Sequence, residues 1–514
     1  MPYIAIALVV TLITLLLTSL QYYYNYWQRR DVPHEKPRFI VGNMSGIGRS
    51  VHFRDINKRL YQRFKAIGVP YTGLFLFLQK AALIIDLDLI KNILIKDFSN
   101  FHDRGIFSNV RDDPLTGHLL ALEGQQWQAM RNKLSPVFTS GKMRYMFPTI
   151  VEVGKNLISA CVILAKENKM NPGVIELKEL CARYTTDVIG TCAFGIDCNS
   201  LHDPEAEFRR KGRSVFGKPR HSQIVQAFMI TNPELARRMR LKIFTDEVSE
   251  FFMNVVRRTV GYRVKNNVKR NDFMDMLIEM KAKNEEMTNV GDGIDLSQGL
   301  TVEQIAAQAF VFFLAGFDTS STTMAMCLYE LALHPEIQQR LREEILQQLA
   351  KHDGQLSYEC VNEMAYLDQV IAETLRKYPL IPHLVRKTVS DYVVPQTQKV
   401  IERGTIIFIP VHALHHDPEI FPEPDNFDPE RFTPDAIQQR HSCAYLPFGD
   451  GPRHCIGLRF GKMQAKIGLI TVLQAFKFSK SSQTEVPLTL SKQNFLLEAE
   501  HGINLKGSLK FEIL

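Results

Sequence analysis

The stretch from Phe448 to Gly457 reads Phe-Gly-Asp-Gly-Pro-Arg-His-Cys-Ile-Gly, which places Cys455 in a loop rich in glycine and proline. Directly after it, apolar residues recur with a helical period. Backbone N–H groups of such a loop and the positive end of the helix dipole would stabilise a thiolate and tune a bound metal. Gly451 and Gly457 leave room for a flat ligand, and Arg453 can reach an anionic group on that ligand.

Two other roles for Cys455 have less support. A buried structural cysteine would not require a loop of this composition. A zinc site would require further ligands, and Cys443 and His454 do not stand at a recognised zinc-ligand spacing. The stretch therefore favours a cysteine thiolate that binds the metal of a flat, partly anionic ligand.

Length and composition indicate a globular protein with a large core. The 514 residues include 62 Lys and Arg against 55 Asp and Glu, a net charge of +7 that is spread along the chain. No basic run suggests nucleic acid as a partner. The eight cysteines have no CxxC spacing and no disulfide framework, which indicates reduced thiols in a cytosol-like compartment.

Residues 2–20 carry no charge and are mostly apolar, which is the length of one membrane-spanning helix. Four tyrosines and Trp27 within residues 22–27 are expected to form an interfacial aromatic belt, and two arginines follow. A cleaved secretory signal would need positive charge before the apolar run, and none is present. We therefore predict an anchor and belt at 1–28, a basic, proline-containing linker at 29–38 and one cytosolic body over 39–514.

Periodicity predicts helical patterns through most of 145–285 and strands at 71–78, 81–86, 392–394 and 405–410, with short strands in the tail. Residues 106–123 are predicted to form a long loop, and loops of this length are usually functional. Residues 228–244 join apolar side chains to a basic cluster, which fits contact with an anionic membrane or a solvated charged face. The three histidines of 412–416 are predicted to lie in a turn-like loop without the spacing of a metal site.

The longest helical pattern covers 301–333, with a capping box formed by Thr301 and Gln304. The sequence Ala-Gly-Phe-Asp-Thr at 315–319 interrupts it. A glycine inside a helix costs about 1 kcal/mol relative to alanine, and an Asp-Thr pair in an apolar run must find polar partners. A structural kink is one explanation. The other is a groove where a small ligand lies beside an acid and an alcohol that relay protons.

Two further motifs place an arginine one helical turn after an aromatic or acidic side chain. Trp127 and Arg131 share a helix face, and a surface cation–π pair is the plain interpretation of that spacing. Glu373 and Arg376 form a second pair, which would contribute little if exposed.

Together these motifs resemble the cytochrome P-450 family. The stretch at 448–457 is similar to its haem-binding signature, and 315–319 is similar to its oxygen-binding motif. Trp-x-x-x-Arg, Glu-x-x-Arg and the Pro-Glu-Arg-Phe of 429–432 occur in the family's order. Residues 98–105 and 122–127 further resemble the insect microsomal enzymes of family six, many of which oxidise plant toxins and insecticides. The resemblance implies a mainly α fold with a smaller β-rich lobe, preceded by one transmembrane helix.

The resemblance also assigns roles to individual residues. Cys455 would be the axial ligand of the iron of haem b, Ala315 and Gly316 would form the oxygen groove, and Asp318 and Thr319 would deliver protons. The remaining haem contacts are expected from Phe448, Gly451, Gly457, Trp127, Arg131, Arg453, Arg386 and Arg104. Glu373, Arg376 and Arg431 would support the cysteine loop. The substrate pocket is expected to be lined by the 106–123 loop and by Phe312, Phe313, Ala315, Thr319, Leu384 and residues 495–497, including Leu496.

The implied activity is a monooxygenase that inserts one oxygen atom from O2 into a lipophilic substrate. No flavin or nicotinamide domain is recognisable, so electrons are expected from NADPH through NADPH–cytochrome P-450 reductase, with cytochrome b5 as a further donor. An acidic partner would meet the basic residues on the cysteine side, which are Arg131, Lys133, Arg453, Arg459 and Lys462. The implied location is the cytosolic face of the endoplasmic reticulum membrane, in contact with lipid.

Three other functions fit parts of the pattern. A non-oxygenating haem-thiolate enzyme would not need the Asp318–Thr319 pair. A haem electron carrier or gas sensor would need a second protein ligand, and no His or Met stands at the groove of the 301–333 helix. A biosynthetic hydroxylase of one hormone, pheromone or fatty acid fits as well as an enzyme of xenobiotic metabolism, because family analogy alone favours the latter.

Overall fold

The computed structural model describes residues 2–168, 171–217, 219–270, 272–281, 299–494 and 496–509. The α-helices of this part of the chain are α1 (Pro2–Tyr24), α2 (Phe53–Lys65), α3 (Leu87–Lys91), α4 (Gly124–Leu134), α5 (Ser140–Glu167), α6 (Leu177–Ile189), α7 (Glu207–Gly217), α8 (Gln223–Thr231), α9 (Pro233–Arg238), α10 (Asp246–Asn266), α11 (Phe273–Glu279), α12 (Val302–Leu333), α13 (Pro335–Lys351), α14 (Tyr358–Glu363), α15 (Ala365–Lys377), α16 (Val411–His415), α17 (Pro434–Gln438) and α18 (Leu458–Ala475). The strands are β1 (Tyr71–Leu76), β2 (Gln79–Ile84), β3 (Val174–Glu176), β4 (Leu384–Lys387), β5 (Tyr392–Val393), β6 (Val400–Ile401), β7 (Ile406–Ile409), β8 (Phe476–Lys480) and β9 (Asn504–Leu509).

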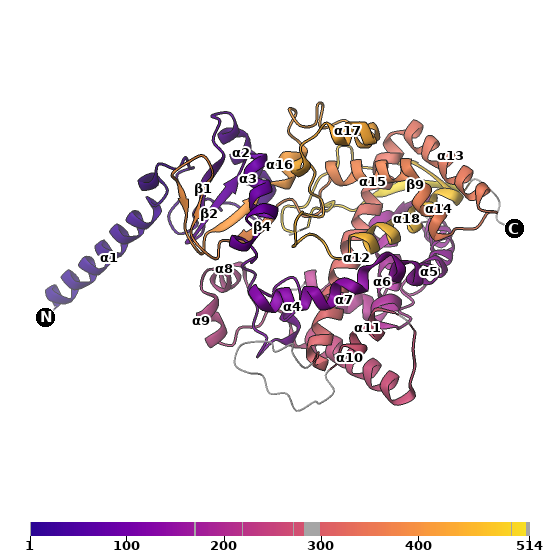
Figure 1. Cartoon of the computed structure of the whole chain (residues 1–514), viewed down its shortest axis with the longest axis horizontal. Coiled ribbons are helices and arrows are strands. Elements are labelled where there is room, and N and C mark those ends of the chain that lie inside the picture. Colours follow the sequence, from indigo (N-terminus) through magenta and orange to yellow (C-terminus); the bar gives the residue numbers. More distant parts are fainter. Residues whose placement is uncertain are drawn as a thin grey trace.

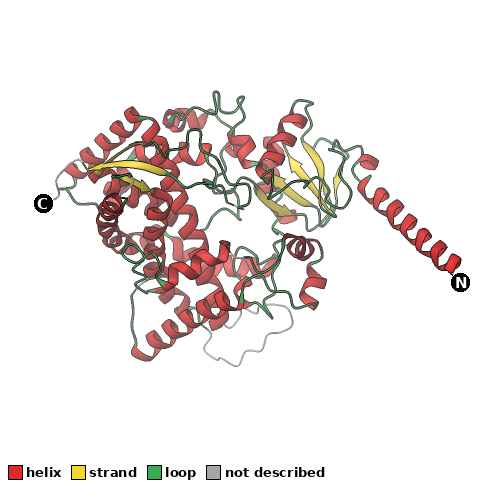
Figure 2. Cartoon of the chain, turned by 180° about the vertical axis from the view of Figure 1, so that it is seen from behind, coloured by secondary structure: helices red, strands yellow, loops and turns green. Residues whose placement is uncertain are grey.

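The fold is mainly helical with a smaller strand-rich lobe, as predicted (Figure 1). The lobe contains a four-stranded sheet in the order β1-β2-β7-β4, in which β2 and β7 run parallel and the other pairs antiparallel. Figure 2 shows this sheet beside α1 and a second, smaller sheet at the far side of the helical body. That second sheet has the order β3-β9-β8, so it joins the middle of the chain to its tail.

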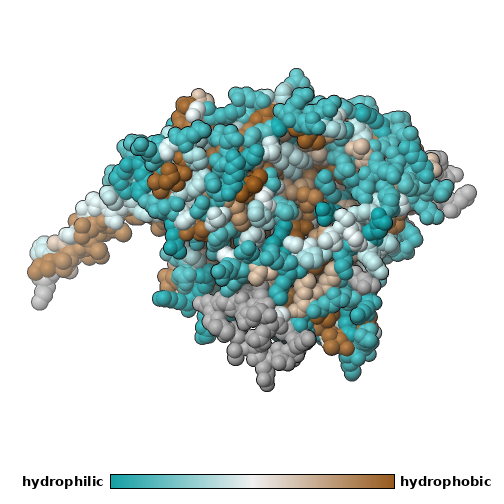
Figure 3. Space-filling model, viewed as in Figure 1, coloured by the Kyte–Doolittle hydropathy of each residue, from teal (hydrophilic) through white to brown (hydrophobic). Residues whose placement is uncertain are grey.

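Helix α1 projects away from the body as a single apolar rod (Figure 3). Its most apolar 18-residue window has a mean hydropathy of 2.5, and the helix is exposed apart from the last turn. At 1.5 Å per residue the 23 residues extend about 35 Å, enough to cross a bilayer. Helices α5 and α12 are also long and apolar enough to span a membrane, but 33% and 72% of their most apolar windows are buried. Those two helices pack within the body, so α1 is the helix that fits a membrane anchor.

The predicted aromatic belt is wrong for the residues nearest the body. Trp27 has 0% of its surface exposed, and its Nε1–H donates to the carbonyl of Leu74 at 3.1 Å. A Cβ at Gly73 would lie 2.3 Å from the indole, so this glycine lets the ring pack directly on β1. Tyr24 and Tyr26 are buried in the same cluster, whereas Tyr22 is exposed. Large aromatic side chains gain more by packing on the sheet, so they fasten α1 to the lobe.

Helix α12 runs through the centre of the helical body (Figure 1). The predicted capping box is confirmed, because the Thr301 side chain accepts from the Gln304 N–H and the Gln304 side chain accepts from the Thr301 N–H. The helix continues without interruption to Leu333, past Gly316. A Cβ at Gly316 would lie 2.5 Å from Cδ1 of Ile189, so the glycine permits close packing of α6.

Three smaller expectations are resolved by the structure. The first hairpin turns at residues 77–78, two residues earlier than predicted. The histidines at 412–416 lie on and directly after the short helix α16, so the expectation of a turn-like loop is wrong there. All eight cysteines are free thiols, as their spacing indicated.

Candidate active site

Cys455 stands in a tight loop just before α18. Its backbone N–H donates to the carbonyl of Phe448 at 2.9 Å, which closes the loop on itself. The side chain of Cys455 is exposed, whereas the other seven cysteines are buried. Burial of the loop raises the pKa of the Cys455 thiol, and the N–H of Gly457 together with the positive charges of Arg131 and Arg104 acts in the opposite direction. Those groups favour a thiolate and therefore metal binding.

The two glycines predicted to make room for a ligand have different surroundings. A Cβ at Gly451 would lie 1.9 Å from the carbonyl oxygen of Leu94, and its φ is +69°. Gly451 is therefore required by the turn and by close approach to the chain at Leu94, and not by a ligand. A Cβ at Gly457 would meet nothing within 4 Å, so that side of the loop faces open space.

The middle of α12 is accessible although both of its flanks are buried. Residues 305–311 and 320–332 are buried, but Ala315 is exposed and Phe312, Gly316 and Thr319 are half-buried. The accessible positions 312, 315, 316 and 319 recur every three or four residues and therefore lie on one side of α12, between two buried stretches. The Thr319 hydroxyl lies on this side and donates to the Ala315 carbonyl at 2.5 Å.

The cysteine loop and the accessible part of α12 are connected through α18. Gln464, in the second turn of α18, donates from Nε2 to the carbonyl of Gly316 at 2.7 Å. A Cβ at Gly461 would lie 3.8 Å from Oγ of Ser320. Helix α18 therefore begins three residues after Cys455 and crosses α12 next to the accessible residues.

Three arginines that were predicted to contact haem gather beside the cysteine loop. Arg104 donates from Nη2 to the carbonyl of Arg453 at 3.0 Å. Burial first, and then neighbouring guanidinium groups, lower the pKa of Arg453 to about 8, of Arg386 to about 9 and of Arg104 to about 10. Nε of Arg386 is buried without a hydrogen-bond partner among the described residues. Crowded, incompletely paired cations of this kind fit a ligand that carries carboxylates.

Trp127 and Arg131 contact the cysteine loop separately. Arg131 donates from Nη1 to the carbonyl of His454 at 3.1 Å. The guanidinium carbon that lies over the Trp127 ring, 4.0 Å from its centroid, belongs to Arg453. The alternative of a surface cation–π pair between Trp127 and Arg131 is therefore wrong, because the ring pairs with Arg453, whose own N–H groups hold the carbonyls of His102 and Leu122.

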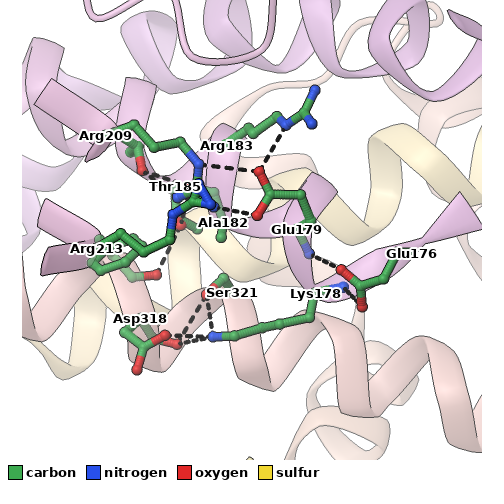
Figure 4. A network of polar contacts seen from close by, with 12 residues as sticks. Glu176, Lys178, Glu179, Ala182, Arg183, Thr185, Arg209, Arg213, Asp318 and Ser321 are labelled. Atoms are coloured by element: carbon green, nitrogen blue, oxygen red, sulfur yellow. Dashed lines mark hydrogen bonds and ion pairs between the residues drawn. The ribbon is translucent and has the colours of Figure 1, made fainter. Parts of the chain in front are cut away.

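Asp318 lies in an ion pair that the sequence did not reveal. Its Oδ1 is 2.5 Å from Nζ of Lys178 on α6, and the same ammonium group contacts the hydroxyls of Ser321 and Thr322 (Figure 4). Both charged side chains are mostly buried. Lys178 has no motif around it in the sequence, and only the packing of α6 on α12 brings it to Asp318.

The same region of α6 carries a second ionic cluster. Glu179 accepts from Arg183 on its own helix and from the buried Arg209 on α7 (Figure 4). Successive residues of α6 therefore tie this helix to α12 through Lys178 and to α7 through Glu179, which fixes the side of α12 that adjoins the accessible face.

The three residues predicted to support the cysteine loop meet in the structure. Nε of Arg376 is 2.7 Å from Oε2 of Glu373, and both side chains have 0% of their surface exposed. Arg431, on the 3-10 turn Pro429–Phe432, places Nε 3.5 Å from Oε1 of Glu373. The remaining Arg376 donors hold the carbonyls of His415 and Pro424, so the cluster joins α15 to the segment that leads to the cysteine loop.

The residues expected to line the substrate pocket fall into two groups. Leu384 lies next to Gly449 of the cysteine loop, and Leu496 and Phe312 are half-buried. Phe313 is fully buried and packs against Phe208 and Phe252, on the far side of α12 from Ala315. The helical period separates positions 312 and 313 by about 100°, so Phe313 belongs to the core. Phe495 lies outside the described residues.

Comparison with known proteins identifies the family. The Cytochrome P450 family profile matches residues 32–505. A Drosophila melanogaster protein named probable cytochrome P450 6a14 is 59% identical over 484 residues, covering 94% of this chain and 95% of the relative. Cytochrome P450 6a2 of the same organism is 47% identical over 505 residues, covering 98% of this chain and 99% of that relative. The exposed cysteine, the cationic cluster and the accessible face of α12 fit this assignment, and the chain therefore belongs to the cytochrome P450 family, whose members are monooxygenases that bind haem through a cysteine thiolate.

Proposed function

We propose that this monooxygenase oxidises a range of lipophilic foreign compounds, such as plant toxins and insecticides, with electrons from NADPH delivered by NADPH–cytochrome P-450 reductase. The observation that carries the proposal is the accessible face of α12, where Ala315, Phe312 and Thr319 are open and no charged side chain of the helix lies among them. A face of this kind favours apolar substrates, and it has no charged side chain that would select substrates carrying one particular polar group. The alternative is a hydroxylase of one hormone, pheromone or fatty acid.

In this proposal Cys455 would bind the haem iron through its thiolate, and Arg453, Arg386 and Arg104 would pair with the haem carboxylates. The bound haem supplies the oxygen-activating chemistry. Gly457 donates its N–H to the cysteine sulfur and thereby limits the thiolate's electron donation. Arg131, held on the carbonyl of His454, adds positive charge on the same side.

Thr319 and Asp318 are proposed to supply protons. The Thr319 hydroxyl stands on the accessible face and donates to the Ala315 carbonyl, so it can pass a proton by rotating away from that acceptor. Asp318 lies on the adjoining side of the helix and is neutralised by Lys178. We propose that Lys178 holds the Asp318 side chain in place between turnovers and that Asp318 must leave this contact to reach the accessible face.

The proposed location is the cytosolic face of the endoplasmic reticulum membrane, with α1 as the anchor. Helices α8 and α9 add a second lipid contact in this proposal, because Ile224 is 81% exposed and Met239 is 57% exposed beside the basic residues of α9. Lys133, Arg459 and Lys462 are not buried and surround the cysteine side. They are the proposed docking face for the acidic reductase, with cytochrome b5 as a further donor.

The test is a titration of the purified haem protein with furanocoumarins, several insecticide classes, fatty acids and steroids, followed by the haem absorption shift. Reconstitution with reductase and NADPH then measures the product from each compound. The expected result is a shift with many compounds, each of modest affinity, and NADPH-dependent products. One tight responder among silent compounds would replace this proposal by the biosynthetic alternative. Product formation without NADPH and reductase would contradict the proposed electron source.

A further inference from the structure

Gln308 holds the 106–123 loop by both ends of its amide. The side chain has 0% of its surface exposed. Its Nε2 donates to the carbonyl of Gly117 at 3.1 Å, and its Oε1 accepts from the N–H of Leu119 at 2.9 Å. The amide therefore pairs with the loop as a neighbouring strand would, and both of its polar ends are engaged. A substrate does not reach it directly.

We call these two hydrogen bonds the Gln308 clamp. The position of Gln308 on α12 connects the clamp to the active site. Phe312, Ala315 and Thr319 follow it by four, seven and eleven residues, which places all four on one stripe of the helix. Gln308 lies two turns, about 10 Å, along the axis from Ala315. The clamp therefore sets the height of the loop above the accessible face of α12.

Other contacts hold the loop from different sides. Arg453 donates from Nη2 to the carbonyl of Leu122 at 2.7 Å, which fastens the end of the loop to the cysteine side. Asp113 accepts from the backbone N–H groups of Ile243 and Phe244, at 2.8 and 3.1 Å. These bonds fasten the first half of the loop to the segment after α9. Between these two points the Gln308 amide holds the part of the loop that lies against α12.

We propose that Gln308 is a positioning residue for substrate specificity, acting through the 106–123 loop. This inference rests on the proposed function in one respect, namely that lipophilic substrates lie between the loop and the accessible face of α12. With both hydrogen bonds in place, residues 117–119 stay at one distance from Ala315 and the site accepts compounds that fit beneath them. Without them the loop moves outward and larger compounds bind better relative to small ones.

The chain offers a matched control in Gln338 on α13, which is 1% exposed. Its Nε2 donates to the carbonyls of Leu331 and Phe478, and its Oε1 accepts from the N–H of Phe478 at 2.9 Å. Gln338 thus clamps β8 as Gln308 clamps the loop, and β8 lies in the small sheet away from the accessible face of α12. Gln338→Leu removes equivalent hydrogen bonds without touching the loop.

The experiment compares the full-length haem proteins carrying Gln308→Leu, Gln308→Asn and Gln338→Leu with the unmodified protein. Asparagine keeps the amide but is one methylene shorter, so it cannot reach both partners and offers a milder change. Hydrogen–deuterium exchange measures the amides of residues 115–123 and 476–480. The substrate panel measures relative affinities by haem absorption shift, and the reduced carbon-monoxide spectrum reports whether thiolate ligation is intact.

Both Gln308 variants are expected to raise exchange at 115–123, by about tenfold for leucine, and to shift the affinity ratio of large to small compounds by at least about threefold. The carbon-monoxide spectrum is expected to stay unchanged. Gln338→Leu is expected to raise exchange at 476–480 and to leave the affinity ratio as it was. An equal shift in the ratio for Gln338→Leu would overturn the inference, because general loosening would then be the cause. Unchanged exchange at 115–123, or faster exchange with an unchanged ratio, would overturn it as well.

Failure of the proposed function would give results that differ from failure of the Gln308 inference. If the unmodified protein responds to a single compound, the breadth of substrates is wrong, and Gln308 is then judged by loop exchange and by the affinity for that one compound. If no compound gives a shift, exchange at 115–123 in the two Gln308 variants decides whether the clamp holds the loop, and an unchanged rate would overturn the inference.

Discussion

Single side chains determine which of the eight cysteines is available to a metal. Seven are buried, and Cys455 is exposed with the Gly457 N–H at its sulfur. We expect Cys455→Ser to abolish the thiolate-type band of the reduced carbon-monoxide complex and to lower turnover at least about a hundredfold. Cys443→Ser is the control, because Cys443 is a buried cysteine in the same part of the chain. A thiolate-type band that persists in Cys455→Ser would refute the ligand assignment.

The ion pair of Lys178 with Asp318 is a second feature at this scale. Lys178→Met leaves a mostly buried carboxylate without its partner, and we expect it to lower the free energy of unfolding by about 1–3 kcal/mol, reduced from the cost of a fully buried pair by partial exposure. Adding Asp318→Asn removes the unpaired charge and is expected to restore most of the stability. If Asp318 supplies protons, the single and the double variant that carry Asp318→Asn should both form less product per NADPH consumed. Thermal unfolding and product-to-NADPH ratios measure the two effects, and normal coupling in Asp318→Asn would remove Asp318 from the proton path.

At the scale of one element, α16 makes stability depend on pH. The rings of His412 and His416 stack with centroids 4.1 Å apart, and burial, followed by neighbouring charges, lowers the pKa of His416 to about 4. The unfolded chain takes up its proton near pH 6.5, before the folded chain does. This contribution to stability is therefore complete above pH 6.5 and is lost as the pH falls toward 4.

We expect His416→Leu to weaken this pH dependence. The loss of unfolding free energy between pH 7 and pH 5 should be smaller than in the unmodified protein by about 1–2 kcal/mol. Chemical denaturation at the two pH values measures it. Burial also lowers the pKa values of His383, His412 and His415, so these histidines contribute in the same direction and provide residual dependence in the variant. An identical pH dependence in both proteins would contradict the prediction.

At the scale of the whole molecule, the anchor and the body meet at the aromatic cluster of residues 24–27 and not at a free hinge. The carbonyl of Pro33 accepts from the Gly73 N–H at 3.0 Å, which also fastens the proline segment to β1. Deletion of residues 2–20 is therefore expected to weaken sedimentation with lipid vesicles strongly, to the level that α8 and α9 alone support, while leaving the melting temperature of the body unchanged. Deletion of residues 2–30 also removes Trp27, whose loss alone costs about 3–5 kcal/mol, and should lower the melting temperature by several degrees. Equal melting temperatures for the two deletions would show that the cluster does not stabilise the body.

Much of the fold could be predicted from the sequence because it depends on patterns of neighbouring residues. The capping box at Thr301, the apolar run of α1 and the alternation in β7 are properties of neighbouring residues. The structure has the capping box as predicted and β7 within one position of its predicted ends, and α1 continues four residues beyond the apolar run. The Glu373–Arg376 pair was readable for the same reason, since one helical turn joins its members. The turn of the first hairpin was misplaced because nothing at residues 77–80 specifies one two-residue loop over another.

The sequence by itself determined the family, the cysteine loop, the central helix and the anchor, because short motifs and hydrophobic periods specify each of them. Only the tertiary structure decided that Trp27 packs on β1, that Gly451 is required by Leu94 and that Phe313 belongs to the core. It alone brought Lys178 to Asp318 and Gln308 to Leu119, pairs that are 140 and 189 residues apart. The physical reason is that a contact between distant residues depends on how whole helices pack, and no local period records which faces will meet.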